Sequence, residues 1–160
     1  MPKTKEQNIQ IIIAFYKAFQ AKDADTMVAF YHDEVVFEDP AFGLLKGEHA
    51  KNMWRMLCQN AEDLEVSASQ IDANTQNGKC VWTANYTFRQ TNRKVKNIIK
   101  ANFEFKDGKI YRHADEFDLH KWATQALGFK GWLIGRTRYF QNKLQQQTNR
   151  LLSKFEANND

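Results

Sequence analysis

The spacing of hydrophobic residues changes from a mainly helical to a strand-like period near residue 64. Before that point apolar side chains recur every three or four residues, which is typical of amphipathic helices. This pattern predicts helices at residues 7–21, 25–31 and 49–61. Beyond residue 64, short apolar segments alternate with turn signals, which is typical of strands. The order predicts an α+β fold in which helices pack on one face of a mostly antiparallel sheet.

Turn signals divide the second half into strands. Asn77-Gly78, Asn92-Arg93 and Asp107-Gly108 each predict a chain reversal. They separate four predicted strands, which together form a meander. The strands are expected to begin near Leu64 and to continue over residues 79–88, 95–105 and 110–117.

A further short strand is expected at residues 35–37, ahead of Pro40. Proline lacks the backbone N–H that a continuing ladder would need, so the strand should stop there. Asp39 is therefore predicted at a strand end.

The last forty residues depart from this plan. Gly128, Gly131 and Gly135 interrupt a stretch rich in Trp, Leu and Ile. Residues 139–155 predict a helix whose apolar stripe is Phe140, Leu144, Leu151, Leu152 and Phe155. That stripe must pack on the domain itself or on a second subunit. We assign residues 1–120 to one domain and residues 121–160 to a C-terminal helical extension of it.

The extension is basic. Residues 129–160 hold six Lys and Arg side chains against Glu156 and Asp160. A solvated helix face explains this charge most simply, because no nucleic-acid motif accompanies it, and we expect no nucleic-acid partner. A membrane-surface or nucleic-acid role for the basic tail is the weaker alternative.

Length and composition exclude several classes of protein. A chain of 160 residues with 42% hydrophobic residues suits one domain with a real core. No apolar run is long enough for a membrane span, the polar start does not resemble a secretory signal, and the two cysteines suggest a reduced, cytoplasmic setting. His32, His49 and His120 lack ligand spacing, and we expect neither a metal nor a cofactor.

Two segments resemble a known family. Ala14 to Pro40, containing Phe37-Glu38-Asp39-Pro40, resembles the opening helices and first strand of bacterial ketosteroid isomerases and SnoaL-like proteins, of the nuclear transport factor two-like superfamily. Lys109 to Asp118 resembles their closing His-x-Asp-x-aromatic-Asp strand. The resemblance covers residues 7–120 and implies a cone-shaped roll that encloses a pocket for a small, hydrophobic ligand.

The resemblance also implies a homodimer formed through the outer face of the sheet. The contact face would be Lys96, Ile98, Lys100, Asn102 and Glu104.

The isomerase residues carry over only in part. Asp39 falls where those enzymes keep the aspartate that moves a proton between two carbons. Phe15 and Ala101 fall where they keep the tyrosine and the protonated aspartate that bind the enolate oxygen, and neither can donate a hydrogen bond. Steroid isomerase activity is therefore not expected, unless Tyr16 replaces the missing tyrosine.

The last strand supplies a second carboxyl group. Alternation sends Tyr111, His113, Asp115 and Phe117 to one face and Arg112 to the other. Resemblance to SnoaL-like cyclases makes Asp115 a candidate acid/base. An epoxide hydrolase that resembles limonene epoxide hydrolase would need an Asp-Arg-Asp arrangement. Arg112 is expected on the opposite face of the strand from Asp115, which argues against this activity.

These arguments select eleven candidate site residues. The catalytic candidates are Asp39, Asp115 and His113, and the ligand-binding candidates are Phe15, Tyr16, Phe19, Trp54, Trp82, Ala101, Phe103 and Phe117. Five of them have a structural alternative: a turn residue for Asp39, mutual hydrogen bonding for His113 and Asp115, and core packing for Trp54 and Trp82.

Two functions remain open. The first is small-molecule binding with cofactor-free acid/base catalysis of isomerase, cyclase or hydrolase type. The second is a non-catalytic ligand carrier or dimeric interaction module, because one fold can serve several functions.

Overall fold

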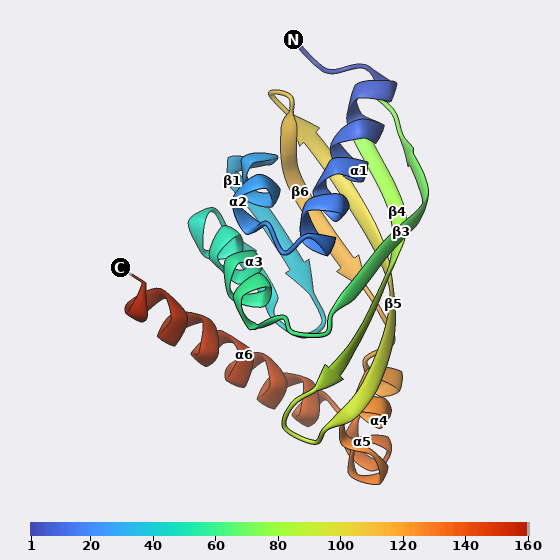
Figure 1. Cartoon of the computed structure of the whole chain (residues 1–160), viewed down its shortest axis with the longest axis vertical. Coiled ribbons are helices and arrows are strands. Elements are labelled where there is room, and N and C mark those ends of the chain that lie inside the picture. Colours follow the sequence, from blue (N-terminus) through green and yellow to red (C-terminus); the bar gives the residue numbers. More distant parts are fainter. Residues whose placement is uncertain (160) are drawn as a thin grey trace.

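A computed structural model describes residues 1–159. Six strands form one curved, open sheet, and helices lie on one of its faces and around one end (Figure 1). In chain order the elements are α1 (Lys5–Gln20), α2 (Ala24–Ala29), β1 (Tyr31–Asp39), β2 (Gly43–Lys46), α3 (Glu48–Asn60), β3 (Glu65–Ala73), β4 (Asn77–Phe88), β5 (Arg93–Lys106), β6 (Lys109–Glu116), α4 (Leu119–Leu127), α5 (Phe129–Ile134) and α6 (Arg138–Asn158).

The sheet places β1, from the first third of the chain, beside β6, its last strand. Its strand order is β2-β1-β6-β5-β4-β3, and every neighbouring pair is antiparallel except β1 with β6. Because β1 runs parallel to β6, the end of the first strand lies beside the end of the last. The α+β cone fold predicted from the sequence is confirmed.

Helix α1 covers the concave face. Thr4 and Gln7 form a capping box at its start, which satisfies backbone N–H groups that a helix would otherwise leave unpaired. Its apolar stripe, including Ile12, Phe15 and Phe19, is buried in the main core. The predicted helical spacing is confirmed here.

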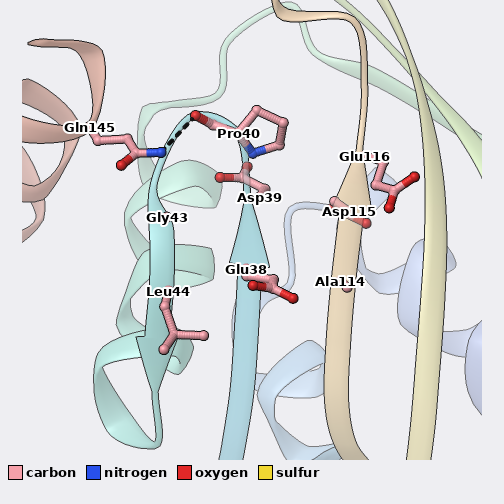
Figure 2. Close-up of a pocket in the computed structure, with 9 residues that line it drawn as sticks. All are labelled: Glu38, Asp39, Pro40, Gly43, Leu44, Ala114, Asp115, Glu116 and Gln145. Carbon is pink, nitrogen blue, oxygen red and sulfur yellow. Dashed lines mark hydrogen bonds between the residues drawn. The ribbon is translucent and has the colours of Figure 1, made fainter. Parts of the chain in front are cut away.

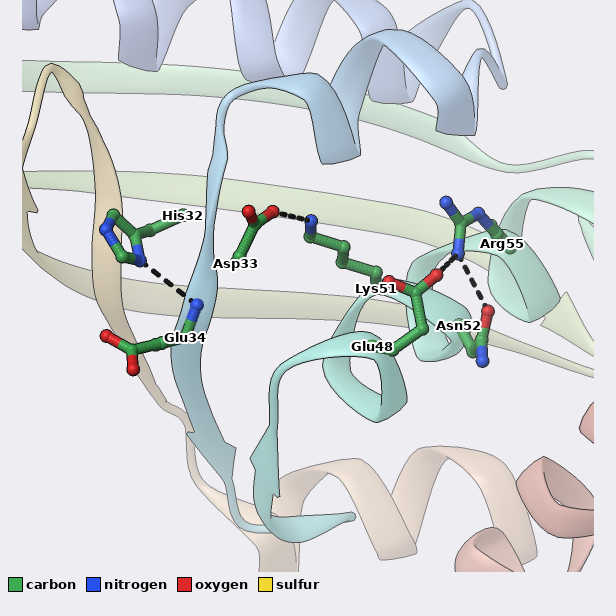
Figure 3. A network of polar contacts seen from close by, with 7 residues as sticks. All are labelled: His32, Asp33, Glu34, Glu48, Lys51, Asn52 and Arg55. Atoms are coloured by element: carbon green, nitrogen blue, oxygen red, sulfur yellow. Dashed lines mark hydrogen bonds and ion pairs between the residues drawn. The ribbon is translucent and has the colours of Figure 1, made fainter.

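Polar contacts connect β1, α3 and α6. Lys51 Nζ lies 3.1 Å from Asp33 Oδ1, which ties α3 to β1 (Figure 3). Glu156 of α6 accepts from Asn52 Nδ2 at 2.8 Å and pairs with His49 Nδ1 at 2.7 Å. The C-terminal helix is therefore held against α3 by charge and hydrogen bonds as well as by its apolar stripe.

A second, smaller core lies at the far end of the β4–β5 hairpin. It is built mainly from the buried Val95, Trp122, Ala123, Ala126 and Phe140. Trp122 Nε1 donates to Tyr86 Oη at 2.7 Å. This core fixes α4 and the start of α6 on the sheet. Within residues 1–159, no helix has both the length and the apolar character needed to cross a membrane.

The first predicted turn lies elsewhere. Asn74 Oδ1 accepts from the backbone N–H groups of Gln76 and Asn77, so the reversal occurs there and Asn77-Gly78 opens β4. A Cβ on Gly78 would stand 2.8 Å from Ile12 Cδ1. Gly78 is therefore explained by close helix packing rather than by turn geometry.

Other expectations also need correction. Tyr31 was expected to continue the second helix, but α2 ends at Ala29 and Tyr31 opens β1. The strand at residues 35–37 extends over nine residues, and β2 was not predicted. The predicted helical extension begins with two short helices, α4 and α5, whose bounds were not predicted. A register shift in β6 buries Ile110 and turns Tyr111 out of the core, against His32 and Lys106.

Candidate functional site

Two carboxyl groups meet at the ends of β1 and β6. Glu38 is level with Ala114 in the parallel pairing, so Asp39 and Asp115 follow on neighbouring strands, which lie about 5 Å apart. They border a cavity of about 320 Å³ (Figure 2). Its lining is Glu38, Asp39, Pro40, Gly43, Leu44, Ala114, Asp115, Glu116 and Gln145.

Asp39 is half-buried and fixed by the turn that follows β1. Its Oδ1 accepts from the backbone N–H groups of Ala41 at 3.0 Å and Phe42 at 2.6 Å. Burial raises the pKa of Asp39 to about 7, the two N–H donors oppose this, and the nearby charge of Asp115 adds to it. The carboxyl group can therefore take up and release a proton near neutral pH.

Asp115 lies deeper and is held by two ring N–H groups. It is 5% exposed, and its Oδ1 accepts from Trp82 Nε1 at 3.3 Å. The same oxygen lies 2.9 Å from His113 Nε2. These bonds fix one carboxylate oxygen.

A hydrogen-bond chain continues from His113 into the core. Trp54 Nε1 donates to Tyr31 Oη at 2.7 Å, and Tyr31 Oη lies 2.7 Å from His113 Nδ1. Tyr31 Oη accepts from Trp54 and has one hydroxyl proton of its own. It donates this proton to Nδ1 of His113, so each of the two hydrogen bonds has one donor and one acceptor. We therefore assign a neutral His113 that carries its proton on Nε2 and donates it to Asp115.

Aromatic rings surround His113, which is fully buried. Its ring stacks on Trp54 with centroids 5.8 Å apart, and Phe103 lies 4.5 Å away. Phe15 and Phe37 meet it edge-on. Because this apolar surrounding disfavours a charge, it is consistent with the neutral tautomer.

The predicted ligand-binding residues lie together in the interior, where they pack on one another. Phe15, Tyr16, Phe19, Trp54, Trp82, Ala101 and Phe103 are all buried in the main core, and Phe117 is partly buried beside it. None of them lines the cavity at Asp39. Tyr16 borders a second cavity of about 250 Å³ between α1 and β3, and its buried hydroxyl lacks a hydrogen-bond partner within residues 1–159.

Several residues of the site were missed from the sequence. Tyr31 was assigned to a helix because its spacing from neighbouring apolar residues also suits a helix. Leu44 was not recognised because its strand has only four residues, too few to show an alternating pattern. Gln145 comes from α6, where it donates to the carbonyl of Pro40 at 3.1 Å. No local signal in the sequence connects that helix to Pro40.

Arg112 lies on the opposite side of β6 from the buried Asp115, as the alternation predicted. Its guanidinium lies 3.1 Å from Oε1 of Glu38, which lines the cavity, but Arg112 itself is not among the lining residues. Across residues 1–159, no group of three or more His, Cys, Asp or Glu side chains is arranged to hold a metal ion.

The curved sheet and the helices packed on it place the chain among cone-shaped α+β proteins. A family model described as a SnoaL-like domain matches residues 12–113, well over half of the chain. The chain therefore belongs to the SnoaL-like domain family, as its sequence motifs predicted.

Solved structures share this fold. An LEH-like epoxide hydrolase of M. tuberculosis is 26% identical over 82% of this chain and 92% of its own, with a TM-score of 0.63. A candidate polyketide cyclase of Xanthomonas campestris is 18% identical over 77% and 98%, with a TM-score of 0.65. A Catenulispora acidiphila protein of ketosteroid isomerase-like fold, in complex with trimethylamine, is 12% identical over 73% and 92%, also at 0.65. No match was found among curated proteins.

Proposed function

We propose that the cavity at Asp39 and Asp115 binds a small, largely apolar molecule and transfers a proton within it without a cofactor. The observation that carries this proposal is the pairing of two carboxyl groups in unlike surroundings. Asp39 has a pKa raised to about 7, whereas Asp115 is held by two N–H donors. Unlike surroundings give paired carboxyl groups separate acid and base roles.

In this proposal Asp39 is the general base. It takes a proton from the substrate and returns it to another substrate atom, so the enzyme ends each cycle unchanged. Asp115 binds the opposite end of the substrate by accepting a hydrogen bond from it. His113 and Tyr31 are positioning residues, since they hold Asp115 and touch the cavity only through it.

Steroid isomerase activity is not part of the proposal. The two donors that the isomerases aim at the enolate oxygen correspond to Phe15 and Ala101, and both are buried, non-donating side chains. Loss of one such donor typically lowers the rate by about 100-fold to 1000-fold. A cyclase or another isomerase fits the residues better.

Hydrolysis of epoxides has one point in its favour and one against it. The epoxide hydrolase of M. tuberculosis is 26% identical over most of this chain. However, the Asp-Arg-Asp arrangement that the resemblance requires is incomplete, because Arg112 pairs with Glu38 and is not among the residues that line the cavity. We rank proton transfer within one molecule above water addition.

A ligand screen with matched variants tests the proposal. Thermal stabilisation is measured with apolar ketones, polyketide fragments, terpenoid epoxides and steroids, first for the wild type and then for Asp39→Asn and Asp115→Asn. We expect a hit that weakens in both variants and stays unchanged in Glu65→Gln, an exposed carboxylate on β3.

Turnover is then tested with the hit. A proton transferred by Asp39 as a base should give a rate that rises as the pH passes through about 7. The rate should fall by about 100-fold or more in Asp39→Asn. Ligand binding that is identical in both carboxyl variants, or turnover with no dependence on Asp39, would refute the proposal.

A non-catalytic carrier or dimeric interaction module is the second candidate. It is favoured by the filled interior and by Ile98, which is 57% exposed on the outer face of β5. A homodimer through that face would cover Ile98. Sedimentation velocity should then show a dimer that Ile98→Glu dissociates, with no loss of stability in the monomer.

A further inference from the structure

Helix α5 presents an apolar face to the surroundings. Phe129, Trp132 and Leu133 are 74%, 55% and 62% exposed, and the rings of Phe129 and Trp132 stack with centroids 5.8 Å apart. Most large apolar side chains of this chain lie in its two cores. An exposed apolar group of this kind usually marks an interaction surface.

The packing of α5 fixes which face is exposed. A Cβ on Gly131 would overlap the carbonyl oxygen of Ala123, and one on Gly135 would stand 2.8 Å from Ala123 Cβ. These glycines let α5 lie directly on α4, and His120 Nε2 reaches the Trp132 carbonyl at 2.9 Å. The opposite face, with Phe129, Trp132 and Leu133, is held outward by this contact.

The surroundings of this face are basic. Between Asp118 and Glu156 the sequence contains no Asp or Glu and seven Lys or Arg residues. Lys121, Lys130, Arg136 and Arg138 are exposed, and none of the four forms an ion pair within residues 1–159. A negatively charged partner is therefore favoured.

The shape of the region favours a flat partner. Helices α4 and α5 form the lower end of the molecule, at one end of its longest axis (Figure 1). The two cavities described above lie elsewhere, at Asp39 and between α1 and β3. The apolar face of α5 is therefore separate from both cavities, at this end of the molecule. Aromatic and aliphatic side chains flanked by cations on a protruding helix suit the interface of a bilayer, where rings enter the headgroup layer and cations contact lipid phosphates.

We propose that the apolar face of α5, with its flanking cations, binds the surface of anionic membranes. Phe129, Trp132 and Leu133 enter the headgroup region, and Lys130, Arg136 and Arg138 contact lipid phosphates. The proposal concerns a different surface from the Asp39 cavity and stands independently of the proposed function.

Trp132 provides a direct readout. The chain has four tryptophans, and Trp54, Trp82 and Trp122 are buried at 1%, 8% and 9% exposure. Quenching by iodide should therefore act mainly on Trp132. Vesicles of equal parts phosphatidylglycerol and phosphatidylcholine should shift its emission to shorter wavelength and protect it from iodide, whereas vesicles of phosphatidylcholine alone should do neither.

Two pairs of variants separate the apolar and charged contributions. Phe129→Ser with Leu133→Ser keeps Trp132 and should lower the vesicle partition coefficient at least about tenfold. Arg136→Ser with Arg138→Ser should lower it about fivefold for each charge removed, and 0.5 M salt should weaken binding similarly. Leu151→Ser, which changes an exposed apolar residue on α6, is the matched control and should bind like the wild type.

The outcomes distinguish the possible partners. Circular dichroism must show that each variant is folded. If a variant does not fold, the shift in Trp132 emission of the wild-type protein still tests the proposal. No binding to phosphatidylglycerol vesicles, or binding without a Trp132 shift, would overturn it. So would a dimer that forms without vesicles and dissociates in the Phe129→Ser, Leu133→Ser variant, because the face would then join two copies of the chain.

Discussion

At the scale of single residues, Asp39 combines two opposing influences. Burial and the charge of Asp115 favour its neutral form, while the N–H groups of Ala41 and Phe42 favour its ionised form. The pKa of about 7 shows that burial prevails. The ionised carboxylate that proton abstraction needs is therefore the less stable form in the folded chain below neutral pH.

This balance predicts how stability depends on pH. In the unfolded chain the Asp39 pKa is about 3.9. Between pH 4 and 7 the folded state therefore binds more protons, so the Asp39 contribution to the free energy of unfolding falls as pH rises, by on the order of 4 kcal/mol. The Asp39→Asn change keeps an acceptor oxygen but removes the ionisable group. Urea unfolding should show that Asp39→Asn matches the wild type near pH 4 and exceeds its stability at pH 8.

The control for this experiment is Asp39→Ala, which removes the acceptor as well. It should be about 1–3 kcal/mol less stable than Asp39→Asn at every pH, since two backbone N–H groups lose their partner. Equal pH slopes for the wild type and Asp39→Asn would contradict the raised pKa.

Tyr31 is the second residue with a measurable role. Tyr31→Phe removes the hydroxyl that joins Trp54 to His113 and leaves two buried ring nitrogens without a partner. We expect a loss of about 2–4 kcal/mol in the free energy of unfolding. Tyr139→Phe, at a 68% exposed position, should change it by less than about 0.5 kcal/mol. A similar effect of both changes would argue against the chain of bonds.

Single-residue roles were predicted unevenly from the sequence. Strand alternation was enough to send His113 and Asp115 to the same buried face. The partner of His113 was not predictable, because Tyr31 is 82 residues away and its apolar neighbours fit a helical period. Short-range spacing gives the direction of a side chain but not what it meets.

At the scale of elements, α6 is connected to the site by side chains that bind a turn. Gln145, Thr148 and Asn149 donate to the carbonyl groups of Pro40, Ala41 and Phe42, respectively, in the turn between β1 and β2. That turn also supplies the N–H donors to Asp39. The position of α6 thus controls the surroundings of the carboxyl group.

Adjacent leucines in α6 test this packing. Leu152 is fully buried in the main core, whereas Leu151 is 47% exposed. Leu152→Ala should lower the free energy of unfolding by about 2–5 kcal/mol, and Leu151→Ala by less than about 1 kcal/mol. Chemical denaturation of both variants measures the difference. Equal losses would mean that α6 does not dock as described.

Elements with a long, regular period were predicted well, and short ones were not. The stripe of α1 was evident from its spacing, and that of α6 only in part, because Leu151 was predicted on the stripe and is exposed. Strand β2 has four residues, and α5 has six, so neither completes enough periods to be recognised. The parallel pairing of β1 with β6 depends on contacts between distant segments, which no local pattern contains.

At the scale of the whole molecule, two cores of different size stabilise the chain. The larger lies between the sheet and helices α1, α2 and α3, and the smaller fixes α4 to the β4–β5 hairpin. Both free cysteines belong to the larger one, Cys58 on α3 and Cys80 on β4. The rate at which a thiol reagent labels them therefore measures how often the main core opens.

Burial raises the pKa of Cys58 to about 11 and that of Cys80 to about 12, so both thiols are protonated and shielded. In the native protein we expect a thiol reagent to label Cys80 only through global unfolding, at least about 1000-fold more slowly than in urea. Among the variants described in this Discussion, the rate of Cys80 labelling should rise as the free energy of unfolding falls. Fast labelling of Cys80 under native conditions would contradict a closed main core.

The parallel contact between β1 and β6 has a consequence for the order of events during synthesis. The two strands pair Glu38 with Ala114, so about seventy-five residues must leave the ribosome between the two halves of the Asp39 and Asp115 pair. Pairing over such a separation is slow, because a long loop must close before any contact compensates for the lost chain entropy. The β1–β2 hairpin emerges first and keeps one unpaired edge, which other chains can join, until β6 arrives. A nascent chain arrested before residue 109 should therefore depend on chaperones, whereas release of the last strand should remove that dependence and complete the paired-carboxyl site in the same step.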